Sequence, residues 1–218
     1  EAEARRSLAA LRESELRLAE ANVERNPEDV DSLAGRATLL VELGRVDEAA
    51  RALDDLERGA RDRGRPDRLF DAAALRLDLG DADGARRLFD EALRESETSA
   101  ESSYYRAYAG AHFDDRDAAF EGARQMRELH GSHPYTPDAA GYAAFAAGDP
   151  AEALERFTET LARQPLRCCS HAWRGIAVAE LGDGEAASQA LSRARTLCMR
   201  GGVHCASVVR LSERVEQG

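Results

Sequence analysis

The sequence predicts an all-α protein, a solenoid in which antiparallel helix pairs stack on one another. A turn point, usually glycine, recurs in steps of 36, 34, 34 and 34 residues, at Gly44, Gly80, Asp114, Gly148 and Gly182. An alanine stands five residues after each turn point, at Ala49, Ala85, Ala119, Ala153 and Ala187. A small residue stands seven before it, at Ala37, Ala73, Ala107, Gly141 and Gly175. A fixed period of this size indicates a stack of similar supersecondary units rather than one globular core.

Each unit is expected to consist of two helices around its turn point. Apolar residues precede Gly80 with the spacing of an amphipathic helix, at Leu69, Phe70, Ala73, Ala74 and Leu77. Glycine at the turn adopts the left-handed conformation that closes a helix at low cost. The second helices are predicted to be capped by Asp47, Asp83, Asp117 and Asp149. The small residues should face each other across the hairpin, so that the two backbones approach closely.

These features resemble the tetratricopeptide repeat, a 34-residue helix–turn–helix with an Ala-x3-Phe pattern in its second helix. Ala85/Phe89 and Ala153/Phe157 match that pattern, and Ala49/Leu53 and Ala187/Leu191 match it with an aliphatic residue. Prolines between repeats occur at Pro27 and Pro165. The resemblance implies one right-handed superhelical solenoid over residues 1–218. It would comprise a helix at 1–25, five repeats over 26–199 and a capping helix at 203–217.

The composition of the chain argues against several classes of binding partner. The net charge of −11 argues against nucleic acid and anionic membranes, which need a cationic face. The sequence has no apolar run long enough to cross a bilayer, so no membrane insertion is expected. Every basic residue is arginine, as expected of a GC-rich bacterial genome. Because the chain begins at Glu1 without methionine, we expect a fragment or a processed form.

One basic cluster interrupts the acidic background. Its members are Arg58, Arg61, Arg63, Arg65 and Arg68, in the lengthened connection between the first two repeats. Two interpretations are open: a solvated loop, or a loop that contacts phosphate.

The resemblance also implies where a partner binds, because the first helices of such repeats line a concave groove. The predicted groove residues are Phe70, Leu77, Asp78, Tyr104, Tyr108, His112, Tyr135, Asp138, Tyr142 and Phe145. Half of the aromatic residues of the chain fall on groove positions, and exposed aromatic groups are the usual anchors of interfaces. Acidic residues accompany them, at Asp31, Glu42, Asp67, Asp78, Glu101, Asp138 and Glu180. We therefore expect a protein or peptide partner with a basic or apolar segment, and not an acidic chaperone tail.

All four cysteines lie near the C-terminal end, at Cys168, Cys169, Cys198 and Cys205, with His171 and His204 nearby. Three alternatives are open: disulfides that pin the terminal helices, half-buried thiols, or a zinc site. Disulfides would imply a periplasmic or secreted protein, and free thiols a cytoplasmic one. Adjacent Cys168 and Cys169 are expected to point to different sides of a helix start and to have different partners.

The sequence carries no catalytic motif and indicates no cofactor, so we expect a binding module and not an enzyme. One alternative is a structural domain that self-associates through its end helices, giving a homo-oligomer. Another is a regulatory or accessory domain of a larger protein.

Overall fold

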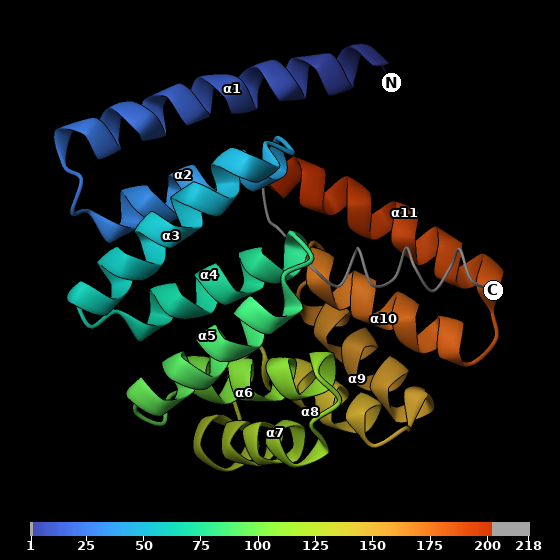
Figure 1. The fold of residues 1–218 in the computed structure, drawn as a ribbon. Coiled ribbons are helices and arrows are strands. Elements are labelled where there is room, and N and C mark those ends of the chain that lie inside the picture. The colour runs from blue at the N-terminus through green and yellow to red at the C-terminus, as the bar shows by residue number, and fades with distance from the viewer. Residues whose placement is uncertain (1, 202–218) are drawn as a thin grey trace. The chain divides into compact units, whose positions relative to one another are not determined.

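The computed structural model describes residues 2–201, with side chains from 10 to 197, and contains eleven α-helices in that range. The all-helical fold with helices packed in consecutive pairs is confirmed (Figure 1). The chain divides into two compact units, one ending at Glu95 and the other beginning at Ser96. No described helix is both long enough and apolar enough to cross a membrane.

The N-terminal unit contains five helices: α1 (Ala2–Arg25), α2 (Val30–Glu42), α3 (Val46–Asp62), α4 (Pro66–Asp78) and α5 (Ala82–Glu95). α1 packs on α2, and the hairpins α2–α3 and α4–α5 pack on each other through α2, α3 and α4 (Figure 1). Their interior is aliphatic with two phenylalanines; its largest fully buried members are Leu16, Leu53, Leu56, Leu69, Phe70 and Phe89. The predicted N-terminal helix is therefore present.

The C-terminal unit contains six: α6 (Ala100–His112), α7 (Arg116–His130), α8 (Thr136–Ala146), α9 (Pro150–Arg163), α10 (Cys168–Glu180) and α11 (Gly184–Gly201). Each helix packs on the next, and α6 also packs on α8, so that two first helices are neighbours. The predicted capping helix at 203–217 lies outside the described residues. The single-solenoid organisation of residues 1–218 stays a prediction.

The turn points fall where the period places them. Gly44, Gly80, Gly148 and Gly182 have φ between +69° and +86°. Asp114 has φ +56° and is the one non-glycine residue with positive φ among the described residues. Each described hairpin therefore closes with a residue in the left-handed conformation, and in the α6–α7 hairpin that residue is Asp114 instead of glycine.

The predicted helix caps are wrong for three of the four named residues. Asp47, Asp83 and Asp117 lie inside the first turn of their helices. The capping carboxylates of α5, α7, α9 and α11 stand directly after the turn point, at Asp81, Asp115, Asp149 and Asp183. Each accepts a hydrogen bond at 2.8–3.0 Å from the backbone N–H three residues later. Asp83 and Asp117 stand two residues beyond the observed caps of their helices, so only Asp149 was placed correctly.

Small residues do sit where two helices meet closely, most tightly between α6 and α7. A Cβ added to Gly110 would lie 2.8 Å from the Cα of Ala119, and one added to Gly122 would lie 2.6 Å from the carbonyl oxygen of Ser103. Both atoms belong to the backbone of the opposite helix. Side-chain rotation cannot relieve such a contact, so glycine is required at both positions.

We predict that Gly110→Ala and Gly122→Ala each lower the free energy of unfolding by about 1–3 kcal/mol, because the helices must separate to admit the methyl group. Gly35→Ala is the matched control: Gly35 lies within α2 and a Cβ there meets no atom within 4 Å. This control should gain up to about 1 kcal/mol from helix propensity. Urea unfolding of the three variants provides the comparison, and wild-type stability in Gly110→Ala would contradict the close approach.

Candidate functional site

The predicted groove positions of the C-terminal unit are occupied by a cluster of rings from α6, α8 and α10. Tyr142 lies at its centre, with ring centroids 5.7 Å from Tyr104, 5.5 Å from Tyr108 and 5.2 Å from Trp173. These contacts are edge-to-face, the arrangement that aromatic quadrupoles favour. Trp173 was not among the predicted groove residues. It is the only tryptophan of the chain and belongs to the repeat that follows the repeat of Tyr142.

We expected the aromatic groove residues to be exposed to solvent, and for Tyr104, Tyr108 and Tyr142 this prediction is wrong. Tyr104, Tyr108 and Tyr142 are only 9%, 5% and 0% exposed. Trp173 of α10 and Tyr104 of α6 both pack against the Tyr142 ring. Asp138 is also fully buried. These four residues are therefore supports of the surface and not part of it.

In the C-terminal unit, three predicted groove residues are only partly buried: His112, Tyr135 and Phe145. His112 and Phe145 both contact Trp173, with ring centroids 5.0 and 5.2 Å away. Tyr135 precedes α8 and Phe145 lies in its last turn, ten residues on, so the two rings mark points about 15 Å apart along the helix. We call these three residues the aromatic rim.

A buried polar network lies beneath the rim. Arg167, which precedes α10, donates from Nε to Asp138 Oδ2 at 2.8 Å and from Nη2 to the hydroxyl of Tyr104 at 2.8 Å. The Tyr104 and Tyr142 hydroxyls are hydrogen-bonded at 2.9 Å, and Ser170 donates to Asp138 at 2.9 Å. The guanidinium also lies over the Tyr135 ring, 3.8 Å from its centroid. The network thus joins α6, α8 and α10 through one arginine.

The electrostatics of the network keep its tyrosines neutral. Burial raises the pKa of Tyr104 and the pKa of Tyr142 above the usual tyrosine range. Burial likewise raises the pKa of Asp138, and the positive charge of Arg167 opposes that rise. The neutral hydroxyls of Tyr104 and Tyr142 therefore act as hydrogen-bond partners within the network.

We predict different losses for two substitutions at Tyr142. Tyr142→Phe keeps the ring and removes one buried hydrogen bond, which should cost about 0.5–1.5 kcal/mol of unfolding free energy. Tyr142→Ala leaves a cavity beside Trp173 and should cost about 3–5 kcal/mol. Urea unfolding separates the two; equal and small losses would show that the ring is not a support of the cluster.

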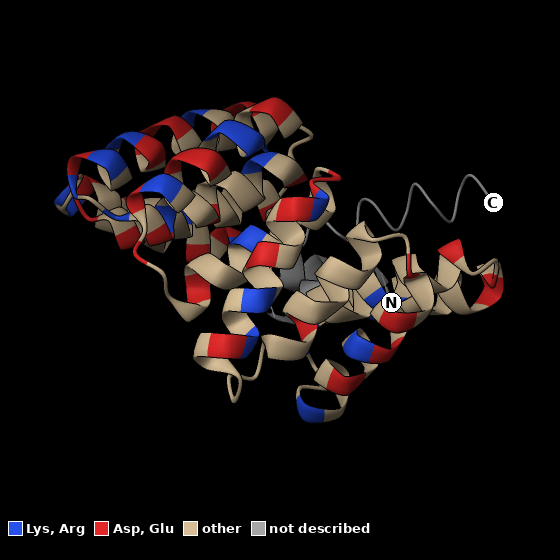
Figure 2. Cartoon of the chain, turned by 90° about the horizontal axis from the view of Figure 1, so that it is seen from below, with Lys and Arg blue, Asp and Glu red and all other residues tan. Residues whose placement is uncertain are grey.

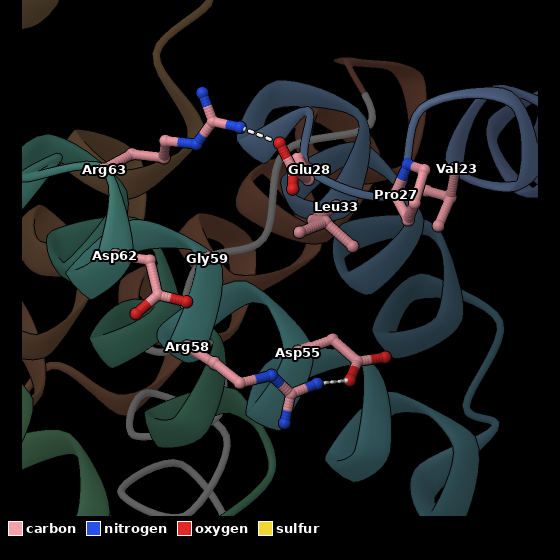
Figure 3. Close-up of a pocket in the computed structure, with 9 residues that line it drawn as sticks. All are labelled: Val23, Pro27, Glu28, Leu33, Asp55, Arg58, Gly59, Asp62 and Arg63. Atoms are coloured by element: carbon pink, nitrogen blue, oxygen red, sulfur yellow. Dashed lines mark hydrogen bonds and ion pairs between the residues drawn. The ribbon is translucent and has the colours of Figure 1, made fainter.

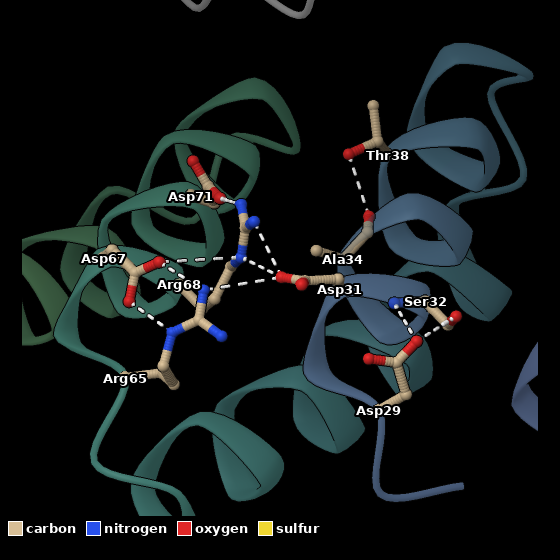
Figure 4. Close-up of polar contacts among 9 residues, drawn as sticks. All are labelled: Asp29, Asp31, Ser32, Ala34, Thr38, Arg65, Asp67, Arg68 and Asp71. Atoms are coloured by element: carbon tan, nitrogen blue, oxygen red, sulfur yellow. Dashed lines mark hydrogen bonds and ion pairs between the residues drawn. The ribbon is translucent and has the colours of Figure 1, made fainter. Parts of the chain in front are cut away.

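In the N-terminal unit, the predicted groove residue Phe70 is 1% exposed and packs on Phe89, so it is a core residue. Leu77 and Asp78 are half-buried. Figure 4 shows that Arg65 and Arg68 bridge the predicted groove carboxylates of α2 and α4. Arg68 lies 2.7 Å from Asp31, and Arg65 forms two hydrogen bonds to Asp67, at 2.8 and 2.6 Å.

The carboxylates of the predicted acidic groove are thus largely neutralised by arginines of the chain itself. Glu42 pairs with Arg12 at 2.9 Å, and Asp138 pairs with Arg167 as described above. With Asp31 and Asp67, four of the seven predicted groove carboxylates are engaged in this way. A basic partner would have to compete with these internal pairs.

The members of the arginine cluster form ion pairs, and Arg58, Arg61 and Arg63 are exposed to solvent. Only Arg63 and Arg65 lie between helices; the other members belong to α3 and α4. Arg58 pairs with Asp55, Arg63 with Glu28, and Arg61 holds Glu91 through two hydrogen bonds at 2.6 and 2.9 Å. Figure 2 shows the basic and acidic residues interspersed along the helices.

The ion pair between Arg61 and Glu91 predicts how the stability of the protein depends on pH. Its hydrogen bonds to Arg61 lower its pKa below the ordinary 4.5. A lowered folded-state pKa stabilises the protein above that ordinary value, and the stabilisation is lost as pH falls through the folded-state pKa. Glu91→Gln should therefore reduce the free energy of unfolding by up to about 1 kcal/mol at pH 7, and the difference from wild type should be smaller at pH 3.

Urea unfolding at both pH values measures this effect, with Glu95→Gln, also on α5, as the control that should change little at either pH. A Glu91→Gln deficit that persists at the lower pH would contradict the role of its charge.

A cavity of 310 Å³ opens in the N-terminal unit, near the start of α2 and the end of α3 (Figure 3). Its apolar floor is Val23, Pro27 and Leu33, beside Gly59. Charged side chains surround it, already joined as Arg58–Asp55 and Arg63–Glu28. A Cβ at Gly59 would lie 3.0 Å from Leu33, so the cavity depends on the absence of a side chain there.

The cysteine predictions are tested only at Cys168 and Cys169, which begin α10. Their sulfur atoms lie 4.0 Å apart, so the expectation that they point to different sides is wrong. The side chain of Cys198 and all of Cys205 and His204 lie outside the described residues, as do the disulfide pairings proposed for them. Among the described residues, no three His, Cys, Asp or Glu side chains gather as a metal site would require.

The hairpins repeat, and each closes with a residue in the left-handed conformation. This repetition defines a helical-repeat protein, and in the C-terminal unit its first helices carry a cluster of aromatic rings. Residues 139–200, from α8 to α11, match the family model of the tetratricopeptide repeat. This segment is therefore a tetratricopeptide repeat, a type of scaffold for protein interaction.

Solved structures share the fold at low sequence identity. A chain of the APC/C hetero-tetramer Cut9–Hcn1 is 20% identical with a TM-score of 0.59; the alignment covers 87% of this chain and 38% of that one. A tetratricopeptide repeat protein from Parabacteroides merdae is 17% identical with a TM-score of 0.55, covering 96% and 79%. BtubC (BKLC) from P. vanneervenii is 16% identical with a TM-score of 0.52, covering 91% and 93%. No curated protein sequence matches the chain.

Proposed function

We propose that the C-terminal unit binds an apolar segment of a protein or peptide on the aromatic rim. The observation that carries this proposal is the contrast between the partly buried His112, Tyr135 and Phe145 and the fully packed rings that they adjoin. Half-exposed rings on a rigid base provide large contact area at little cost in side-chain entropy. Over about 15 Å, an extended peptide places roughly four to five residues.

The internal ion pairs favour an apolar partner over a basic one. Asp138 is the predicted groove carboxylate of α8, three residues after Tyr135, and it is fully buried against Arg167. A lysine or arginine of a partner would gain little from a carboxylate that already has its cation. An apolar side chain placed against Phe145 and His112 gains by leaving water and needs no charge.

The test is selection of peptides from a displayed random library by the whole chain, followed by calorimetric measurement of the selected peptides. We expect apolar and aromatic peptides with few basic residues. The double variant His112→Ala/Phe145→Ala should weaken their Kd by at least about 30-fold, as expected for two truncated anchors.

Phe120→Ala is the matched control, because Phe120 is 46% exposed on α7, a second helix of its repeat. It should leave the affinity unchanged. Equal losses in the control and the double variant, or none in either, would overturn the rim as the binding surface. Selection dominated by basic peptides would instead support the acidic-groove interpretation.

A further inference from the structure

We propose that the cavity of the N-terminal unit binds an arginine side chain supplied by a protein partner (Figure 3). The site is separate from the aromatic rim, because all of its walls belong to residues 23–63. Its volume of 310 Å³ lies at the lower end of the range of small-molecule pockets, which is about 300–1,000 Å³. A cavity of this size suits one long side chain better than a bulky ligand.

The floor of the cavity is suited to an aliphatic stem. Leu33 is buried, Val23 is partly buried and Pro27 is exposed at the opening. Gly59 contributes no side chain, so the space beside Leu33 stays open. An arginine covers apolar surface with its stem and keeps its charged head near water. The floor therefore fits the stem, and the charge at the opening decides which head group is favoured.

That charge is negative by one unit, because three carboxylates and two guanidiniums line the cavity. Figure 3 shows that two of the carboxylates already have cations: Glu28 pairs with Arg63, and Asp55 pairs with Arg58. Asp62 is exposed and forms no ion pair with any residue that the structure describes. An incoming cation therefore meets one carboxylate without competition, whereas an anion would have to displace a carboxylate from its arginine.

The position of Asp62 on α3 brings this carboxylate to the opening. Asp62 follows Gly59 by three residues and Arg58 by four, and helical side chains at these spacings are neighbours. A stem that occupies the space beside Gly59 thus carries its head group to Asp62. A guanidinium binds a carboxylate through two parallel hydrogen bonds and is more weakly hydrated than an ammonium group. Both properties favour arginine over lysine at a partly enclosed site.

The test titrates the whole chain, labelled with ¹⁵N, with a tripeptide that has blocked ends and arginine between two alanines. The matched ligand replaces arginine by citrulline, which has nearly the same shape and no charge. We expect saturable shifts of amide signals around Gly59 with the arginine peptide at millimolar concentration. The citrulline peptide should bind at least about fivefold more weakly, because it loses the charge-assisted hydrogen bonds to Asp62.

Two variants examine the two halves of the site. Asp62→Asn removes the free charge and should also weaken the arginine peptide by about fivefold or more. Asp47→Asn is the matched control, because Asp47 is an exposed carboxylate at the other end of α3, and it should bind as the wild type does. Gly59→Met places a flexible apolar side chain in the cavity and should abolish saturable binding. Urea unfolding checks that each variant is folded, and methionine has the higher helix propensity.

Equal affinity for the arginine and citrulline peptides would overturn the proposal, because the cavity would then not distinguish charge. Wild-type affinity in Asp62→Asn would do the same. An equal loss in Asp47→Asn would show that the peptide responds only to the overall negative charge of the chain. Absence of saturable shifts in the wild type would contradict the site itself. Asp62→Asn changes an exposed residue, so the test remains decisive even if Gly59→Met does not fold.

Discussion

The close approach of two helices within each hairpin is the constraint on which the rest of the structure depends. A left-handed residue at the turn reverses the chain at once, and small residues on both sides remove the side chains that would hold the helices apart. In the α6–α7 hairpin the constraint reaches its limit, since backbone atoms of one helix occupy the space that a Cβ of Gly110 or Gly122 would need. Tight hairpins then leave the larger side chains to fill the space between repeats.

In the C-terminal unit that space is filled by rings around one buried ion pair. Arg167 and Asp138 come from successive repeats, and Arg167 also holds Tyr104 from the repeat before. Removing Arg167 would leave the fully buried Asp138 without its cation, which is far more costly than losing a surface pair. The pair therefore fixes the relative placement of α6, α8 and α10, and the half-exposed rings above them are held in one geometry before any partner arrives.

The period predicted the helices, the turns and the small residues, because these are local requirements repeated along the chain. Exposure of the rings could not be predicted in the same way, because it depends on which side chain of the next repeat covers each ring. Tyr142 is covered by Trp173, and the sequence position of neither ring shows this. The ion pairs did leave a signal: Arg63–Glu28, Arg68–Asp31 and Arg167–Asp138 are 35, 37 and 29 residues apart, close to one repeat. A comparison of opposite charges one period apart would have found them.

The two units thus place different interactions at equivalent positions of the repeat. In the N-terminal unit, arginines and carboxylates one repeat apart satisfy each other at the surface, where such pairs add little stability and leave little charge for a partner. In the C-terminal unit the equivalent interaction is buried, and aromatic rings take the remaining positions. Because desolvated rings contribute more to binding than paired charges do, recognition is expected to reside on α6, α8 and α10. The acidic character of the chain as a whole then governs solubility more than the choice of partner.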